Sequence, residues 1–129
     1  TNHEIVLAKS NRSMWRILSN CSLAILAGGL TSFEAIYAGL PCINIFEKSI
    51  HRDVISGDVL KHVVAINLGL FSGDSLKQLK KYIIELNFSR ETLMQMRKNS
   101  IGLLDKKGSE RTLDKILEEM KNHATTTGD

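Results

Sequence analysis

Two adjacent glycines, Gly28 and Gly29, follow an apolar run and precede a segment that carries hydroxyl side chains and a carboxylate. Because glycine has no Cβ, such a pair lets the backbone turn tightly and approach a ligand closely. The polar residues that follow are Thr31, Ser32 and Glu34. If a helix begins there, its first N–H groups have no partner within the helix and can bind an anion such as phosphate. The spacing predicts a phosphate-binding turn between a strand and a helix.

A second interpretation of the same residues needs no ligand. Thr31 and Glu34 have the Thr-x-x-Glu spacing of a capping box, in which both side chains satisfy backbone N–H groups at a helix start. The two glycines then form only a short loop between a strand and a helix. Gly39, followed by Leu40 and Pro41, predicts a left-handed helix end in either case. The residue spacing leaves both interpretations open.

The run from Met14 to Ile45 contains Ala-Gly-Gly-x-Thr-Ser-x-Glu-Ala, followed by Ala-Gly-Leu-Pro. This run resembles the C-terminal domain of GT-B nucleotide-sugar enzymes. It is most similar to the UDP-sugar hydrolase of pseudaminic acid biosynthesis and the related spore-coat polysaccharide proteins. A second segment, Leu104–Arg111, is similar to the Asp-Gly-Lys-Gly-x-x-Arg sequence that opens the last helix of that family. The two motifs stand in the family's order along the chain.

The resemblance implies a role for each residue of the first motif. Gly28, Gly29, Thr31 and Ser32 would face the diphosphate of a UDP-sugar, and Glu34 would accept hydrogen bonds from the ribose hydroxyls. Neutral N–H and O–H donors suit a diphosphate, and a carboxylate suits a vicinal diol. No cofactor and no metal are expected. No catalytic residue is assigned, because the family's catalytic histidine lies in its N-terminal domain.

The chain departs from the family pattern around this motif. Ser13 and Ser22 stand where relatives usually have Asn and Asp, and the Asn-Gln pair that helps hold the sugar is replaced near His51 and Arg52. His51 and Arg52 are candidate ligands for an anionic group, and a solvated loop is the alternative. The sugar specificity therefore stays open.

The alternation of apolar segments, together with the resemblance, predicts an α/β fold: a Rossmann-like parallel sheet flanked by helices, one half of a GT-B fold, with a helical C-terminal segment. The expected strands are Glu4–Ala8, Leu23–Ala27, Cys42–Phe46 and Val63–Leu68. The expected helices between them are Ser13–Ser19, Ser32–Ala38 and His51–Lys61. After Gly69, apolar residues recur at helical spacing in three stripes. These are Leu76, Leu79, Ile83 and Leu86; Leu93, Met96, Ile101 and Leu104; and Leu113, Ile116, Leu117 and Met120. Met94 and Met96 are expected in the core.

The composition bounds the class of protein. The 129 residues suffice for one domain, expected over residues 1–122 with a frayed tail at 123–129. A net charge of +3 with scattered lysines and 5% aromatic residues argues against nucleic acid as a partner. No apolar run approaches a membrane span and no signal peptide is recognisable. We therefore expect a cytoplasmic protein in which Cys21 and Cys42 are reduced core residues.

Two functions remain as hypotheses. The first is the nucleotide-sugar-binding domain of a GT-B-like glycosyltransferase or UDP-sugar hydrolase in surface polysaccharide or nonulosonic acid biosynthesis. Because the chain starts at Thr1, without Met and just before an expected strand, the N-terminal domain of the same protein is the expected partner. The isolated chain is then expected to be inactive. The alternative is a non-catalytic, degenerate α/β module that acts through protein contacts.

Overall fold

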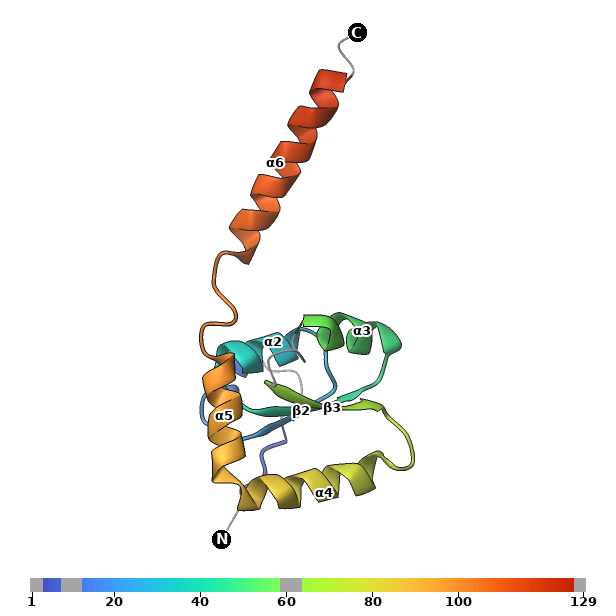
Figure 1. Cartoon of the computed structure of the whole chain (residues 1–129), viewed down its shortest axis with the longest axis vertical. Coiled ribbons are helices and arrows are strands. Elements are labelled where there is room, and N and C mark those ends of the chain that lie inside the picture. The colour runs from blue at the N-terminus through green and yellow to red at the C-terminus, as the bar shows by residue number, and fades with distance from the viewer. Residues whose placement is uncertain (1–3, 8–12, 59–63, 127–129) are drawn as a thin grey trace.

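The computed structural model describes residues 4–7, 13–58 and 64–126 of the chain. Its centre is a small parallel sheet of three strands with helices on both faces, followed by a helical C-terminal segment (Figure 1). The strands are β1 (Ala24–Leu26), β2 (Cys42–Phe46) and β3 (Ala65–Leu70). The helices are α1 (Met14–Leu18), α2 (Leu30–Tyr37), α3 (Ser49–Asp58), α4 (Ser75–Phe88), α5 (Arg90–Ser100) and α6 (Gly108–Thr126).

β2 is the middle strand of the sheet and pairs in parallel with β1 on one side and β3 on the other. Its residues are covered on both faces, which explains why Cys42–Phe46 reads as an almost unbroken apolar run. Cys42 and Phe46 face a core cluster shared with α1 and α2. Ile43 faces a second cluster, to which α4 and α5 contribute. The sheet is therefore the shared wall of two small cores.

The end of α2 follows the sequence prediction. Gly39 adopts φ 66°, and its N–H donates to the carbonyl of Ile36 over 2.9 Å. The N–H of Leu40 donates to the carbonyl of Ala35, also over 2.9 Å. This pair of bonds is a Schellman motif, and the Leu40 side chain is buried in the core beside it. The predicted helix end at Gly39 is confirmed.

Several predicted boundaries differ from the structure. Residues 4–7 of the predicted first strand belong to no strand and are exposed, and Ala8 lies outside the described residues. An extended apolar segment becomes a strand only where a neighbour offers it hydrogen bonds, and the described sheet ends at β1 on that side. α2 begins at Leu30 rather than Ser32, and α3 begins at Ser49 rather than His51. β3 covers residues 65–70 instead of 63–68. The expected end of the helix before it, at residue 61, and the expected strand start, at residue 63, lie outside the described part of the chain.

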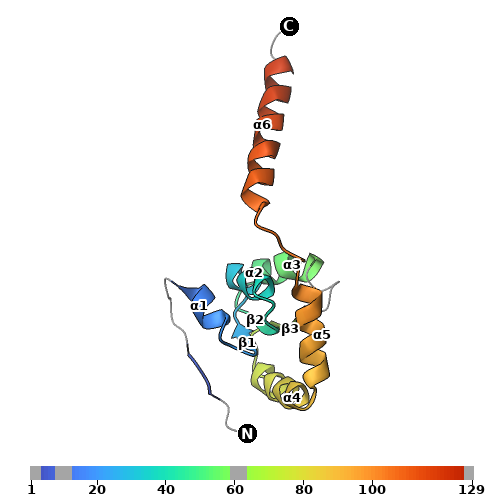
Figure 2. The same ribbon diagram turned by 90° about the vertical axis from the view of Figure 1, so that its left-hand side faces the viewer.

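The helical C-terminal segment is confirmed, but its apolar residues are not all in the core. Met96 is buried between α5 and the sheet, whereas Met94 is exposed, contrary to prediction. In Figures 1 and 2, α6 projects away from the rest of the molecule. Its side chains are exposed from Gly108 to Ala124, so the predicted third stripe has no core to fill. None of the helices in the described part of the chain has the length and apolar character that a membrane span requires.

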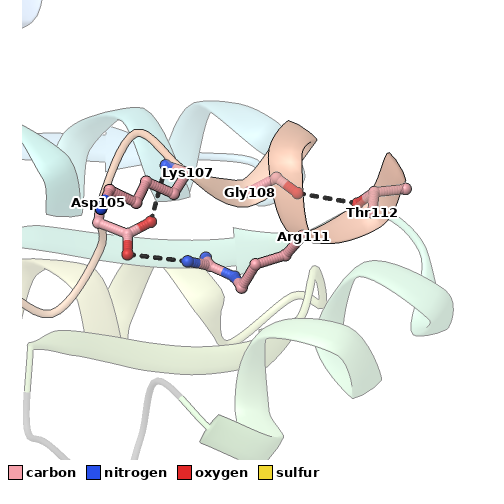
Figure 3. A network of polar contacts seen from close by, with 5 residues as sticks. All are labelled: Asp105, Lys107, Gly108, Arg111 and Thr112. Atoms are coloured by element: carbon pink, nitrogen blue, oxygen red, sulfur yellow. Dashed lines mark hydrogen bonds and ion pairs between the residues drawn. The ribbon is translucent and has the colours of Figure 1, made fainter. Parts of the chain in front are cut away.

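The start of α6 is held by Asp105 (Figure 3). One carboxylate oxygen accepts a hydrogen bond from the Lys107 N–H at 2.9 Å, and the other pairs with Arg111 Nη1 at 2.8 Å. The bond from Arg111, followed by that from Lys107, lowers the pKa of Asp105 below its ordinary value. Both side chains of the ion pair are exposed, so the pair orders the junction more than it stabilises the fold.

We predict that Arg111→Gln raises the pKa of Asp105 towards its ordinary value. Since the folded-state pKa is depressed, the contribution of the pair is complete at neutral pH and is lost as the pH falls below about 4. A ¹³C NMR titration of the Asp105 carboxyl carbon measures this change, and added salt should reduce the difference between the two proteins. Identical titration curves for both proteins at low salt would show that the ion pair does not form in solution.

Candidate functional site

The glycine loop, residues Gly28 and Gly29, joins β1 to α2 at the carboxyl edge of the parallel sheet. Both glycines adopt the left-handed region, with φ 88° and 75°. Residues with a Cβ rarely adopt that region, so the backbone shape itself calls for glycine. Ligands of open parallel sheets bind outside the carboxyl ends of the strands, and this loop occupies that position.

Gly28 also has a packing reason to lack a side chain. A Cβ at this position would lie 2.5 Å from Cδ1 and 2.8 Å from Cε1 of Phe46. Phe46 is fully buried at the end of β2, so its ring has no room to withdraw. A Cβ added at Gly29 would have its nearest neighbour atom 3.9 Å away, an ordinary contact distance. Core packing therefore explains why residue 28 lacks a side chain, whereas at position 29 there is space for a Cβ.

The first turn of α2 carries no side-chain cap. Gly29 is the N-cap residue, and as a glycine it has no side chain to accept a hydrogen bond from the first turn. Thr31 is half-buried in the first turn, and Glu34 is exposed further along the helix. The predicted capping box is wrong, because the helix begins two residues earlier than Thr-x-x-Glu spacing requires. The N–H groups of Leu30 and Thr31 belong to the turn in which a helix supplies no acceptors.

His51 lies beside this helix start. Its Nδ1 and Cε1 atoms would be 4.0 and 3.9 Å from a Cβ on Gly29, which places the imidazole next to the loop. The ring comes from the first turn of α3, which follows β2, so the starts of two helices converge at the sheet edge. Arg52 has a different position: its Nε donates to Asp53 at 2.8 Å, and both side chains are exposed. The structure brings His51 to the loop and pairs Arg52 with its neighbour.

Ser32 points into the fold and not outward with the rest of the motif. It is fully buried, and its hydroxyl donates to Asn44 Oδ1 at 2.9 Å. Asn44 Nδ2 donates in turn to Asn67 Oδ1 at 2.8 Å. The Asn67 Nδ2 group is buried and has no hydrogen-bond partner among the described residues, an arrangement that costs about 1–3 kcal/mol unless a water or ligand atom fills it. The Ser32 hydroxyl is thus engaged internally, unlike the role that the resemblance implies.

Sequence reasoning missed Asn44 and Asn67. A single amide inside the otherwise apolar segment Cys42–Phe46 was the available signal, because buried polar side chains in strands need partners. Which partners they find depends on sheet register, and the structure places Asn44 opposite Asn67 on adjacent strands. Spacing along the chain contains no information on that register.

Glu34 lines an aromatic groove of about 430 Å³ between α1, α2 and the segment that leads into α6. Trp15 and Tyr37 form one wall, with ring centroids 5.6 Å apart and planes tilted by 49°. The full lining is Trp15, Phe33, Glu34, Tyr37, Leu103, Leu104, Asp105, Gly108 and Arg111. Glu34 lies five residues beyond Gly29, which corresponds to about 7.5 Å along a helix. The Glu34 carboxylate and the Tyr37 ring therefore lie further along the helix that follows the loop, whereas the Trp15 ring comes from α1.

The cysteines and carboxylates of the described residues form no metal-binding cluster. Cys42 is buried in the core, and burial raises the pKa of its thiol to about 12, so it is an inert thiol at neutral pH. Cys21 is half-buried, and both cysteines are free, as predicted. Among the described residues, no three His, Cys, Asp or Glu side chains are grouped so that they could hold a metal ion.

No family model, no curated protein and no solved structure matches this chain. The interpretation of the site therefore depends on its sequence motifs and on its geometry.

The two glycines should respond differently to substitution by alanine. We predict that Gly28→Ala lowers the free energy of unfolding by about 1–3 kcal/mol through the clash with Phe46 and by a further 1–2 kcal/mol, roughly, through its left-handed φ. Gly29→Ala should lose only the second contribution, about 1–2 kcal/mol. Urea unfolding measures both values. Gly73→Ala is the control, because open space surrounds Gly73. Equal losses at positions 28 and 29 would contradict the packing argument.

Proposed function

We propose that this chain is the nucleotide-sugar-binding domain of a GT-B-like glycosyltransferase or UDP-sugar hydrolase in surface polysaccharide or nonulosonic acid biosynthesis. In this proposal the three-stranded sheet belongs to a Rossmann-like half of a GT-B fold. The observation that carries it is the uncapped start of α2 behind the glycine loop, with His51 beside it. Free N–H groups at a helix start bind phosphate groups well. The resemblance to GT-B enzymes suggests that the bound anion is the diphosphate of a UDP-sugar.

The positions of Glu34 and the aromatic groove support a nucleotide over a bare phosphate. With the diphosphate at the glycine loop, the ribose hydroxyls would extend along α2 to the exposed Glu34 carboxylate. The rings of Trp15 and Tyr37, beyond Glu34, offer a stacking surface for a base. Glu34 and Tyr37 follow the glycine loop in that order along α2, and Trp15 reaches the same groove from α1.

We propose that the residues of the site bind and orient the nucleotide-sugar, and that the acid, base or nucleophile of the reaction comes from another part of the protein. We propose that the N-terminal domain of the same protein completes the site and contributes the catalytic group, so that the isolated chain is inactive. We also propose a cytoplasmic location, because free cysteines such as Cys21 and Cys42 are usual in reducing compartments.

The first test of this function is a titration of the protein with UDP, CMP and GDP, followed by amide NMR. We predict weak binding of UDP with the largest shifts at residues 28–34 and at His51, because a single domain supplies only part of a two-domain cleft. Shifts that appear elsewhere, with residues 28–34 unmoved at millimolar UDP, would show that the glycine loop is not the phosphate site.

Glu34→Gln isolates the ribose contact. Since Glu34 is exposed and caps nothing, the substitution should leave stability unchanged and weaken UDP binding about fivefold, the difference between a charged and a neutral acceptor. Glu91→Gln, which changes another exposed helical glutamate, is the matched control and should leave the affinity unchanged. Equal UDP affinity for Glu34→Gln and the wild type would remove Glu34 from the site.

A second candidate function is a non-catalytic α/β module that acts through protein contacts. The observation that favours it is the exposed apolar stripe of α6, formed by Leu113, Ile116, Leu117 and Met120. Each of these side chains is 45–63% exposed, and monomeric proteins seldom leave such a contiguous stripe uncovered. A contact surface on α6 is also compatible with the first candidate, so the UDP titration distinguishes the two.

We predict that the stripe is not part of the core of the isolated chain. The double substitution Ile116→Gln with Leu117→Gln should change the free energy of unfolding by less than about 0.5 kcal/mol. Ile36→Ala, which empties a fully buried position, should cost about 2–5 kcal/mol. Chemical denaturation measures both. A comparable loss in the double variant would show that α6 packs on the body in solution.

A further inference from the structure

The carboxyl end of β2 contacts the glycine loop and the helix start at two places. Phe46 packs against Gly28, and Asn44 accepts a hydrogen bond from Ser32 in the first turn of α2. These contacts lie on either side of Gly29, the N-cap residue of the helix. One end of one strand therefore supports both the loop and the turn whose N–H groups are open to a ligand.

The hydrogen bond of Ser32 differs from that of another buried serine in this chain. A serine inside a helix commonly donates to a carbonyl one turn earlier in the same helix. Ser100 does so in α5, where its hydroxyl donates to the Met96 carbonyl at 2.8 Å. Ser32 instead donates to a strand, so its hydrogen bond joins two elements of secondary structure. That bond resists rotation and sliding of the helix start over the sheet.

Asn44 is itself held in one orientation. Its Nδ2 donates to Asn67 Oδ1 on β3, and the two residues are register partners in the sheet. Asn44 is fully buried, so a ligand outside the sheet edge cannot touch its side chain. Any effect of Asn44 on binding must therefore pass through its neighbours.

We propose that Asn44 is the positioning residue of the glycine loop: through Ser32 it fixes the first turn of α2 and hence the direction of the N–H groups there. Asn67 sets the orientation of the Asn44 amide. The ligand-binding consequence of this proposal rests on the proposed function, whereas the positioning itself is a property of the ligand-free protein. The two can therefore be tested apart.

The first experiment measures amide hydrogen exchange in the ligand-free protein. In Ser32→Ala, exchange of the hydrogen-bonded N–H at position 32 in the first turn of α2 should accelerate about fivefold while the other helices keep their wild-type rates. The reporter is the Ser32 N–H, which donates to the Gly29 carbonyl at 3.2 Å. Ser100→Ala, the matched control, loses a buried serine bond of similar length and should affect only α5. Uniform acceleration over the whole molecule, or none in α2, would overturn the positioning role.

The second experiment is a double-mutant cycle with UDP affinity as the readout. Ser32→Ala and Asn44→Leu should each weaken UDP binding about fivefold, and the double variant should bind no more weakly than either single variant. Ser100→Ala should bind UDP as the wild type does. If the two losses multiply, or if only Ser32→Ala weakens binding, Ser32 does not act through Asn44 and the proposal is wrong.

The outcomes separate this inference from the proposed function. Absence of UDP binding by the wild-type protein contradicts the nucleotide-sugar function, yet the exchange experiment still decides whether Ser32 and Asn44 hold the helix start. Should Asn44→Leu fail to fold, the comparison of Ser32→Ala with Ser100→Ala carries the decision. Binding by the wild type with normal affinity in Ser32→Ala overturns the positioning role and leaves the function standing.

Discussion

The contact between Gly28 and Phe46 is the constraint on which the rest of the site depends. Phe46 fills the core beneath the end of β1, and its ring occupies the space that a Cβ at position 28 would need. The backbone can pass over the ring only because residue 28 is glycine. The loop therefore packs directly on the core at the sheet edge where α2 and α3 both begin. The packing of Phe46 in the core therefore also determines the backbone shape of the candidate binding site.

A helix start without a side-chain cap is a second consequence of that loop. With Gly29 as the N-cap, α2 loses only a few tenths of a kcal/mol relative to a serine cap, so the cost to stability is small. The gain is that the N-cap residue has no side chain to occupy the N–H groups of the first turn. A ligand anion can then take the place of the cap. The buried hydrogen bond between Ser32 and Asn44 stabilises the same turn from inside the fold. The N–H groups on its outer side can therefore stay ordered without a capping side chain.

The parts of the structure that the sequence predicts well are those set by neighbouring residues. β2 has the predicted bounds, because a short apolar run of this composition can be satisfied only between two covered faces. The end of α2 at Gly39 was predictable, since a left-handed glycine followed by an apolar residue closes a helix by local hydrogen bonds. The alternation of strands and helices, and hence the parallel sheet, follows from signals of the same local kind. The glycine pair likewise marked the loop correctly as a turn at the carboxyl end of a strand.

Tertiary structure decided what depends on partners far away in the chain. Residues 4–7 have strand-like composition but belong to no strand, because strand pairing needs a neighbour that composition does not specify. The stripe on α6 has helical spacing like that of α5, yet only α5 lies against the sheet. Ser32 was expected to face a ligand, but sheet register places Asn44 where it accepts the Ser32 hydroxyl. Sequence spacing determines which residues share a face of an element. What lies opposite that face is settled only when the elements pack, because those contacts join residues that are distant in the chain.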